Sequence, residues 1–572
     1  MTLWRLAARS AADDERDAAL SRAAGIPAVM APLLRRRGVR TAAEASAYLR
    51  PAEGVLHDVG LLEGAEAAAD LLVATARRGG RIVVFGDYDV DGVTAVAQLR
   101  AALRRIGADA VAFIPHRLRD GYGLRPDTVR RVVAELAPSA IVTVDCGITA
   151  REGVACARAA GVDVVVTDHH LVPKELPDGA IVVNPRQPGC RYPEKDLAAA
   201  GIALKLAEAI GRRAGTPLSV VSLLRAAALG TIADMVPLAG ENRVIAARGL
   251  AALGGSRAPG LRALLAESGV PAGAAPTAEE VSFRIAPRLN AAGRLDTALL
   301  ALSLFEERDA SRAFEIARDL SERNGERRAL ERRVVAEARA RVEARDGGVG
   351  SLIVEADAGW HRGVLGIAAS RLAREYHRPV LLFGIEGDRA SGSGRSIPGL
   401  SLHGLLDTLA HRFTDFGGHE QAVGGSLPAS SFEAFRDDAR ELFAESVPAE
   451  ILERVAEVDA PLELEQIDSD LVDALSRLEP HGSGNPRPVF LARGVRTASP
   501  FAPLGAGGHG ISGRLRAPRG PFRAVAWQPS ETVARLTESG ASMDLLYRVE
   551  PPRHGYASSI EILDARPAEN AA

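Results

Sequence analysis

The sequence contains only three cysteines, Cys146, Cys156 and Cys190, and no two of them form a CxxC pair. This excludes a disulfide framework and a zinc ribbon, and it is typical of a reduced, intracellular protein. Because no run of 18 apolar residues is present, a membrane-spanning helix is not expected. The N-terminus soon becomes acidic and lacks the apolar core of a secretory signal. We therefore expect a cytoplasmic protein.

Lysine and aromatic residues are also scarce. Only three lysines occur among the 70 basic residues, and aromatic residues make up 4% of the chain. The arginine excess is weak evidence for phosphate binding, since codon bias produces the same composition. A formal net charge of −3 neither requires nor excludes a nucleic-acid partner, because a local basic groove can be hidden in a neutral total. The length of 572 residues, 47% of them hydrophobic, predicts two to four domains with sizeable cores.

The first half of the chain alternates short apolar runs with helical segments. Strands are expected at 81–85, 110–114, 140–147, 162–170 and 180–184, and helices at 93–106, 126–136 and 151–160. Short strands that are apolar throughout indicate a parallel sheet covered by helices on both faces. In open sheets of this kind, ligands bind outside the carboxyl ends of the strands.

Acidic residues and histidines gather at those strand ends, and one more acid lies in the mostly helical stretch 217–253. They are Asp87, Asp89 and Asp91 in GDYDVDG (86–92), Asp145, then Asp168, His169 and His170 in VTDHH, and Asp234 in GTIADMVPL (230–238). Carboxylates from separate segments, together with an imidazole, suit Mn²⁺, whereas Mg²⁺ prefers oxygen ligands and water. A carboxylate that bridges two ions would hold them about 3.5–4 Å apart, the arrangement used for in-line attack on phosphates.

Each of these residues alone has an ordinary structural explanation. A single Asp after a strand is more often a helix N-cap or a turn residue, and Asp87 or Asp91 could cap the helix that begins near Val93. Adjacent histidines in a loop are usually exposed or hydrogen-bonded. However, like charges that crowd one strand end are costly without a cation to neutralise them. The joint pattern therefore favours a metal site.

The motifs GDYDVDGVT, VDCGIT, VTDHH and GTIADMVPL occur in that order. They are accompanied by IPHRLRDGYGL (114–124), RIAPRLNAAGRLD (284–296), WHRGVLGIAASRL (360–372), SGSGRS (391–396), FGGHEQAVGGSL (416–427) and PHGSGNPRPVF (480–490). Together they resemble the DHH phosphoesterase superfamily and, within it, the RecJ family of bacterial single-strand-specific 5′→3′ DNA exonucleases. The resemblance covers roughly residues 25–565.

The resemblance implies a site with two divalent cations, Mn²⁺ or Mg²⁺, and a role for each motif. Asp87, Asp89 and Asp91 would form the first metal-binding motif, but the resemblance does not decide which two of them ligate directly. Asp145 would bridge the ions, and His169 and Asp234 would complete the ligand set. His170 would approach the substrate phosphate, and Asp168 would orient its neighbours. The expected catalytic residues are Asp89, Asp145, His169 and His170.

The second half of the chain predicts two further domains. Residues 303–345 contain one glycine and no proline, which predicts one long helix, or two broken near Asn324-Gly325. Strands at 351–356 and 379–385, with a helix that opens at Gly363, indicate an α/β domain similar to the DHHA1 domain. After a helix near 468–478, short strands at 488–495, 509–517, 522–528, 543–552 and 558–567 predict a small barrel similar to an OB fold.

Several polar and glycine-rich stretches are candidates for binding a nucleic-acid strand. SGSGRS and FGGHE are expected to form loops that cradle phosphate, and arginine suits phosphate oxygens. By resemblance, both loops would face the metal centre. The candidates are Arg284, Arg288, Asn290, Arg294, His361, Arg362, Ser393, Arg395 and His419. Trp360 could stack on a base or pack in the core.

The barrel has a basic character and a few aromatic residues. Its arginines are 487, 493, 496, 514, 516, 519 and 523, and its candidate stacking residues are Phe490, Phe501, Phe522 and Trp527. We expect most of these aromatic residues in the core. His481 stands where the family pattern has phenylalanine, and it is expected to lie away from the acidic motifs.

These observations predict an α/β protein with a C-terminal barrel. The expected division is an N-terminal segment (1–55), a DHH catalytic domain (56–255), an interdomain segment with a connecting helix (256–345), a DHHA1 domain (346–448) and an OB-fold domain (449–572). The resemblance implies a monomeric exonuclease for single-stranded DNA in recombinational repair and mismatch excision, working with a RecQ-type helicase and a single-strand-binding protein and not with membranes.

Three alternatives remain open. One is a phosphodiesterase for short oligoribonucleotides or cyclic dinucleotides, and another is a manganese pyrophosphatase. Residues 455–565 argue against both, because such proteins are typically shorter and lack an appended barrel. The third is an inactive DHH scaffold in replication, which should have lost metal ligands that this sequence keeps.

Overall fold

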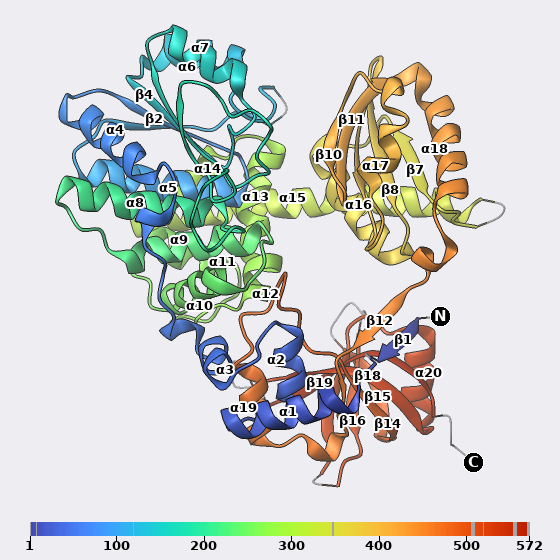
Figure 1. The fold of residues 1–572 in the computed structure, drawn as a ribbon. Coiled ribbons are helices and arrows are strands. Elements are labelled where there is room, and N and C mark those ends of the chain that lie inside the picture. Colours follow the sequence, from blue (N-terminus) through green and yellow to red (C-terminus); the bar gives the residue numbers. More distant parts are fainter. Residues whose placement is uncertain are drawn as a thin grey trace. The chain divides into compact units, whose positions relative to one another are not determined.

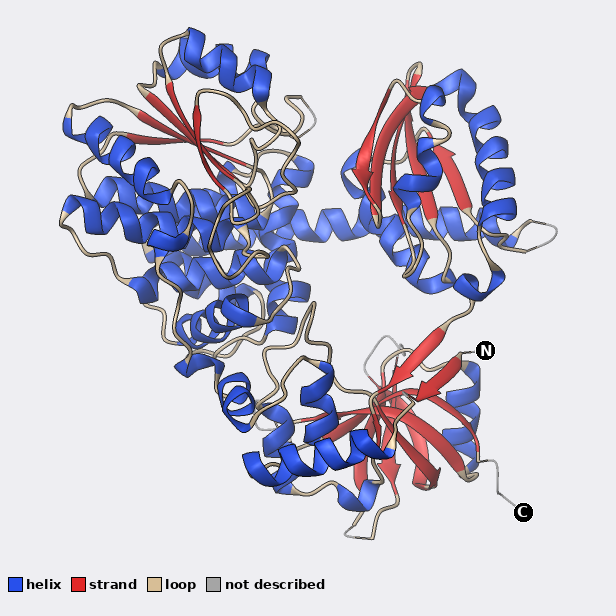
Figure 2. Ribbon diagram, viewed as in Figure 1, coloured by secondary structure: helices blue, strands red, loops and turns tan. Residues whose placement is uncertain are grey.

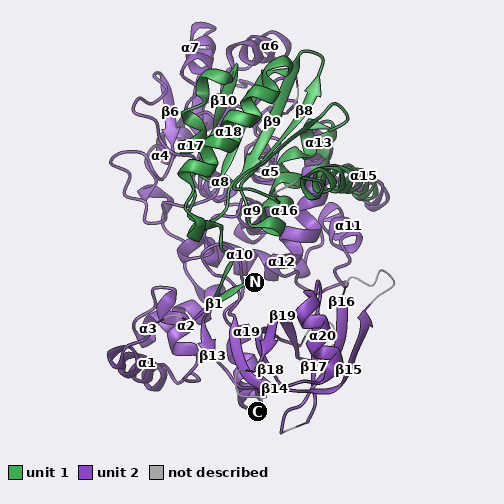
Figure 3. Ribbon diagram, turned by 90° about the vertical axis from the view of Figure 1, so that its right-hand side faces the viewer, with its two compact units in different colours: residues 1–4, 291–296, 318–456 green, residues 5–290, 297–317, 457–572 purple. Residues whose placement is uncertain are grey.

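The computed structural model describes residues 2–6, 8–117, 119–345, 348–504, 510–518, 520–552 and 557–568 (Figures 1 and 2). The chain divides into two compact units (Figure 3): residues 1–4, 291–296 and 318–456 form one, and residues 5–290, 297–317 and 457–572 form the other. Across the described ranges, no helix combines the length and apolarity needed to cross a bilayer.

A parallel sheet of five strands lies at the centre of the first α/β domain, in the order β3-β2-β4-β5-β6. Its strands are β2 (Ile82–Gly86), β3 (Ala110–Phe113), β4 (Ala140–Val144), β5 (Asp163–Thr167) and β6 (Ala180–Val183). The five strands expected here are confirmed. Every residue of β2 and β4 is buried, because helices cover both faces of the sheet.

Five helices supply that cover, with α6 and α7 on one face and α4, α5 and α8 on the other (Figure 1). They are α4 (Ala65–Arg77), α5 (Val90–Arg105), α6 (Pro126–Leu136), α7 (Arg151–Ala159) and α8 (Ala199–Ala214). The apolar side chains of α6 and α7, among them Val132 and Val154, pack against Val83 and Val166 of the sheet.

The strand order creates a switch point between β2 and β4. The chain winds from β2 outward to β3 on one side, and then from β4 outward to β6 on the other. Ligands bind at such a point, because the loops at the carboxyl ends of the two central strands diverge there. Asp87 follows β2 and Asp145 follows β4, and the Asp87 N–H donates to the Val144 carbonyl at 3.3 Å. The topology therefore brings the first two acidic motifs together.

A run of helices connects this sheet to the second α/β domain. They are α9 (Val220–Ala233), α10 (Gly240–Gly254), α11 (Pro259–Glu267), α12 (Ala278–Glu280), a π-helix (Val281–Ile285), α13 (Ala286–Leu295), α14 (Leu299–Glu306) and α15 (Ala310–Glu343). The possible break near Asn324-Gly325 is wrong, since α15 continues through it. The break lies at 307–309 instead, where Glu307 accepts hydrogen bonds from the N–H groups of Arg308 and Asp309.

The second α/β domain contains a five-stranded sheet in the order β10-β11-β9-β8-β7. Its elements are β7 (Ile353–Asp357), α16 (Arg362–Tyr376), β8 (Val380–Glu386), β9 (Arg389–Arg395), α17 (Leu402–Asp407), β10 (Asp415–His419), β11 (Ala422–Pro428) and α18 (Phe432–Ser446). Trp360 packs in its core, 2% exposed, and donates from Nε1 to Glu337.

The expectation that SGSGRS and FGGHE form loops is wrong, because both lie mainly in strands of this sheet. The glycines are needed for packing: a Cβ on Gly392 would lie 2.5 Å from Phe383, and one on Gly394 would lie 2.4 Å from Leu381. Those two large side chains of β8 belong to the core of the domain. Glycine here makes room for core side chains and does not mark a turn.

The C-terminal region forms a seven-stranded sheet in the order β13-β14-β18-β19-β17-β16-β15. Its elements are β13 (Ala460–Pro461), α19 (Ser469–Ser476), β14 (Phe490–Val495), β15 (Thr497–Leu504), β16 (Gly510–Leu515), β17 (Phe522–Ala526), α20 (Glu531–Ser539), β18 (Met543–Glu550) and β19 (Ser559–Pro567). Strand β15 was not expected from the sequence; its Pro500 and Pro503 are tolerated because it is an edge strand. Helix α20 was also missed.

The N-terminal segment packs on this region. Helices α1 (Ala11–Ala24), α2 (Met30–Arg36) and α3 (Ala42–Leu49) share one apolar core with the seven-stranded sheet. Phe490 lies in that core, 1% exposed, Phe501 and Phe522 are half-buried, and Trp527 is 59% exposed. The core expectation is therefore confirmed for Phe490 and wrong for Trp527. Arg519 lies outside the described residues.

His481 lines a small cavity beside Arg487 and Phe490. Its buried Nδ1 has no hydrogen-bond partner among the described residues, and burial lowers its pKa to about 3. Below pH 6.5 the unfolded chain therefore binds a proton that the folded protein does not.

We expect His481→Phe to raise the free energy of unfolding, by about 2 kcal/mol more at pH 5 than at pH 8. Urea unfolding at both pH values measures this, and an equal change at both would contradict it.

Candidate metal centre

The three aspartates after β2 are held in different ways. Asp89 is the N-cap of α5 and accepts from the Gly92 N–H at 3.0 Å. Asp91 accepts from the N–H groups of Ala199 and Ala200, both at 2.8 Å, at the start of α8. The expectation that Asp87 or Asp91 could cap the helix near Val93 is therefore wrong, because Asp89 caps this helix, α5. Asp87 is buried against the switch point.

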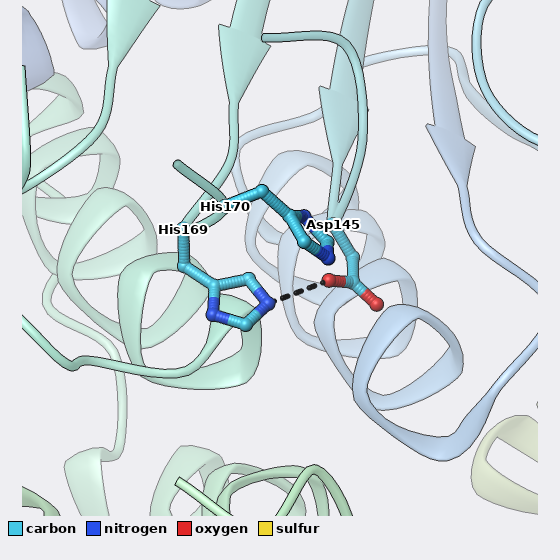
Figure 4. A group of neighbouring side chains, drawn as sticks. All are labelled: Asp145, His169 and His170. Atoms are coloured by element: carbon cyan, nitrogen blue, oxygen red, sulfur yellow. Dashed lines mark ion pairs between the residues drawn. The ribbon is translucent and has the colours of Figure 1, made fainter. Parts of the chain in front are cut away.

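Asp145 and His169 face one another across the ends of β4 and β5 (Figure 4). His169 Nε2 lies 3.1 Å from Asp145 Oδ1, 3.6 Å from Asp234 Oδ2 and 4.0 Å from Asp91 Oδ2. Asp234 reaches this point from the C-terminal end of α9. Asp145 has a left-handed backbone with φ of 62°, a conformation that Asp tolerates better than most residues. One imidazole nitrogen thus lies among three carboxylates from three separate segments.

Asp168 fixes the two histidines beside it. Its Oδ2 accepts from the Ile148 N–H at 2.9 Å, and its Oδ1 accepts from the His169 N–H at 2.8 Å. His170 Nδ1 lies 2.6 Å from the same Oδ1. Burial lowers the pKa of His170, but this hydrogen bond and the negative charges of Asp168, Asp87 and Asp91 together outweigh it, so the net pKa is raised. The pair therefore favours a protonated imidazole at the edge of the cluster.

The carboxyl groups of the cluster resist ionisation in the metal-free protein. Burial, followed by the charge of Asp89, raises the pKa of Asp87 and Asp145 well above the usual value and that of Asp91 to about 7. Burial and the charge of Asp91 raise the pKa of Asp234 to about 9. Burial also lowers the pKa of His169 to about 3, so its ring is neutral. A cation would remove the cost of ionising these groups.

The described side chains fit two divalent cations. Asp87 Oδ1, Asp145 Oδ1 and His169 Nε2 are buried and have no hydrogen-bond partner within the described ranges. Their oxygens and nitrogen fall into groups whose atoms lie within 4.8 Å of one another. The groups are Asp87–Asp89–Asp145, Asp91–His169–Asp234 and Asp145–His169–His170. The first two share no residue, so two ions have separate ligands, and carboxylate with imidazole suits Mn²⁺.

Comparison with known proteins places this site in a family. Models of the DHH family N-terminal domain, the DHHA1 domain and the RecJ OB domain match residues 81–231, 349–445 and 458–563. The chain is 37% identical over 499 residues to the single-stranded-DNA-specific exonuclease RecJ of Salmonella typhimurium, and the match covers 82% of this chain and 85% of that protein. The chain belongs to the RecJ family.

Other RecJ proteins match over similar lengths of this chain. RecJ of Bacillus subtilis is 37% identical over 481 residues, which cover 84% of this chain but 60% of that protein, so the chain spans about three fifths of that relative. The crystal structure of RecJ from Thermus thermophilus in complex with Mn²⁺ matches with a TM-score of 0.82 at 31% identity, covering 99% of this chain and 80% of that one. The Mg²⁺ complex from the same organism matches with a TM-score of 0.77.

Several candidate strand-binding residues lie around the start of α16. His361 caps this helix, with Nδ1 accepting from the Gly363 N–H at 3.1 Å, and Arg362 is its first residue. Arg294 donates to the Gly363 carbonyl at 3.4 Å, and a Cβ on Gly366 would lie 3.0 Å from the Arg395 guanidinium. A helix N-terminus flanked by arginines is suited to phosphate. Ser393 lies along β9, and His419 is exposed at the end of β10.

The remaining candidates lie in the same unit as the acidic cluster. Arg284 lies in the π-helix, and Arg288 Nη1 donates to its carbonyl at 2.6 Å. Asn290 Oδ1 accepts from the Val90 N–H at 3.1 Å, between Asp89 and Asp91, and so ties α13 to the first acidic motif.

Two residues were not singled out from the sequence, one beside the cluster and one exposed on the π-helix. Tyr122 Oη donates to the Asp145 carbonyl at 3.1 Å, and Phe283, in the π-helix beside Arg284, is 70% exposed. Tyr122 lies in the motif IPHRLRDGYGL, which was a usable signal. No sequence signal pointed to an exposed Phe283, because an apolar residue in a helical stretch normally packs in the core.

Met235 has a left-handed backbone with φ of 62°, and it is 72% exposed. The backbone cost is not offset by packing, because most of the side chain is in solvent. We therefore expect Met235→Gly to raise the free energy of unfolding by about 1 kcal/mol. Urea unfolding of the metal-free protein measures this. A loss of stability would mean that the methionine side chain makes stabilising contacts in solution.

Proposed function

We propose that this chain is a metal-dependent exonuclease that hydrolyses the phosphodiester bonds of single-stranded DNA in the 5′→3′ direction. The observation that carries the proposal is the pair of separate ligand groups at the switch point, in a chain of the RecJ family. Relatives of this chain are named single-stranded-DNA-specific exonucleases, and two similar structures hold Mn²⁺ and Mg²⁺. The 5′→3′ polarity rests on the sequence resemblance.

Six residues are proposed as metal ligands. Asp87, Asp89 and Asp145 would hold one ion, and Asp91, His169 and Asp234 the other, with Asp145 positioned to bridge because its Oδ1 lies 3.1 Å from His169 Nε2. Two bound ions supply an activated water and neutralise charge on the attacked phosphate. The chain's own groups hold the site in shape: the helix amides fix Asp91, and Asp168 fixes His169 and His170.

His170 is proposed to bind the scissile phosphate. His170 Nδ1 donates to the Asp168 carboxylate, which leaves His170 Nε2 as the donor for a phosphate oxygen. The raised pKa of His170 favours the protonated ring, and a charged donor binds an anionic oxygen more strongly than a neutral one.

Nine residues are proposed as contacts for the nucleic-acid strand. They are Arg284, Arg288 and Asn290 in one unit, and Arg294, His361, Arg362, Ser393, Arg395 and His419 in the other. The supporting observation is the concentration of arginines at the start of α16.

The biological setting is proposed from the family alone. The enzyme would act as a monomer in the cytoplasm, in recombinational repair and mismatch excision, with a RecQ-type helicase and a single-strand-binding protein. The five-part division of the chain at residues 55, 255, 345 and 448 also remains a proposal.

In the deciding experiment, the purified protein is incubated with Mn²⁺ and two matched duplexes, one with a 5′-phosphorylated single-stranded tail and one with a 3′ tail. We expect nucleotides to be lost from the 5′ tail alone, and not with Asp145→Asn. Tight binding of single strands without digestion would favour an inactive scaffold. Digestion of dinucleotides alone would favour a small-substrate phosphodiesterase.

A further inference from the structure

The turn that carries Asp234 is docked on a loop of the C-terminal region. We call residues 482–485 the docking loop. The Leu238 N–H donates to the Ser483 carbonyl at 2.7 Å. A Cβ on Gly482 would lie 2.7 Å from Leu238 Cδ1, and one on Gly484 would lie 3.0 Å from Pro237 Cβ. Residues 237 and 238, which follow Asp234 closely, are therefore in van der Waals contact with this loop. The motif that contains His481 therefore reaches the turn of Asp234 through the residues that follow the histidine.

The docking loop is itself held rigidly. Asn485 is fully buried and donates from Nδ2 to the carbonyls of Leu478 and Pro480, at 2.7 and 2.8 Å. Arg37 Nε donates to Asn485 Oδ1 at 2.6 Å. Arg243, near the start of α10, donates to four successive carbonyls, those of residues 477–480, at 2.8–3.3 Å. These hydrogen bonds hold Asn485, at the end of the loop, and the segment that leads into it.

Asp234 needs such support more than Asp89 and Asp91 do. Two helix amides hold the carboxylate of Asp91, and one holds that of Asp89. The Asp234 carboxylate accepts no hydrogen bond from the described residues, and the neutral ring of His169 lies 3.6 Å from its Oδ2. Its position therefore depends on the backbone of its own turn, where Met235 adopts a left-handed conformation.

We infer that the docking loop positions Asp234, so that the C-terminal region contributes directly to metal affinity. This inference rests on the proposed metal centre. It gives the C-terminal region a role at the active site in addition to any contact with DNA. The loop residues are positioning residues, because they act through the Asp234 turn and touch neither metal nor substrate.

Gly484→Ala tests the inference, with Gly540→Ala as its matched control. Both glycines have φ of 69° and both lie in the C-terminal region, so a methyl group costs the same backbone strain at each. Only at Gly484 does the new methyl group approach Pro237 at 3.0 Å; at Gly540 its nearest neighbour is Thr497 Oγ1 at an ordinary 3.5 Å. The difference between the variants therefore isolates the contact with the Asp234 turn.

The readout is Mn²⁺ binding without DNA, followed by the electron paramagnetic resonance of free Mn²⁺. We expect Gly484→Ala to weaken one of the two sites about 10–100-fold, as the loss of a residue that orients a ligand does. Gly540→Ala is expected to stay within about twofold of the unsubstituted protein. Asp234→Asn should weaken the same site, and this variant therefore identifies which of the two Mn²⁺ sites contains Asp234. Thermal melts without metal are expected to be lowered in both alanine variants, because they share the backbone strain, and they show that both variants are folded.

Asn485→Ala provides a second route, because it loosens the loop without adding a methyl group near Pro237. It should also weaken that one site and should do so without changing the other. Unchanged Mn²⁺ affinity in both folded loop variants would overturn the inference while leaving the metal centre intact. Failure of the unsubstituted protein to bind Mn²⁺ would instead overturn the proposed function, and with it this inference.

Discussion

Asp145→Asn is expected to reduce the rate of 5′-tail digestion at least about 10³-fold. Asp145 Oδ1 is buried without a hydrogen-bond partner among the described residues, and Asp145 belongs to two of the three candidate ligand groups. Loss of a bridging carboxylate removes several kcal/mol of stabilisation of the reacting phosphate, and each 1.36 kcal/mol is about tenfold in rate. Asparagine is the best replacement, because it tolerates the φ of 62° at this position.

The same substitution should stabilise the metal-free protein. Burial and the charges of Asp89 and Asp91 raise the pKa of Asp145, so its ionised form is unfavourable in the folded state. A neutral amide of the same shape avoids that cost, and the melting temperature in EDTA at pH 8 should rise. Asp127→Asn, at a side chain that is 91% exposed, is the matched control and should change neither quantity. Retention of a tenth of the activity by Asp145→Asn would contradict the assignment.

Most of the candidate cluster could be predicted from the sequence because its determinants are local. The five strands of the parallel sheet are short apolar runs, and the acids follow them directly in the chain. The carboxyl ends of parallel strands share one edge, so residues such as Asp87 and Asp145 converge without knowledge of any long-range contact.

What the sequence could not show depends on contacts between distant segments. The amides of α8 that hold Asp91 lie more than 100 positions along the chain. The docking loop meets the Asp234 turn through residues 238 and 483. The glycines of β9 looked like a loop, because nothing local reveals that Phe383 and Leu381 need the space above them. The sequence shows where glycines lie, but whether they form a turn or make room for a core side chain depends on residues from other strands.

In EDTA, the protein is expected to become less stable as pH rises from about 6.5 to 9. The pKa of Asp91 is raised to about 7 and that of Asp234 to about 9, both mainly by burial. Between pH 4 and these values the folded protein holds protons that the unfolded chain has released. The free energy of unfolding therefore falls with pH, at up to about 1.4 kcal/mol per pH unit for each such carboxyl group. Urea unfolding at pH 6, 7 and 8 measures the slope.

Mn²⁺ should reverse that slope, because it binds the ionised carboxylates. At a free concentration 100 times the dissociation constant, one site adds about 2.7 kcal/mol to the free energy of unfolding, and more at pH 8 than at pH 6. The double variant Asp91→Asn, Asp234→Asn is the control: it removes two of the four carboxyl groups with raised pKa values, so the slope in EDTA should become shallower. If the unsubstituted protein showed a flat profile and no gain from Mn²⁺, the buried charges would be balanced within the protein itself, and the geometry around His169 would have to be explained without a metal.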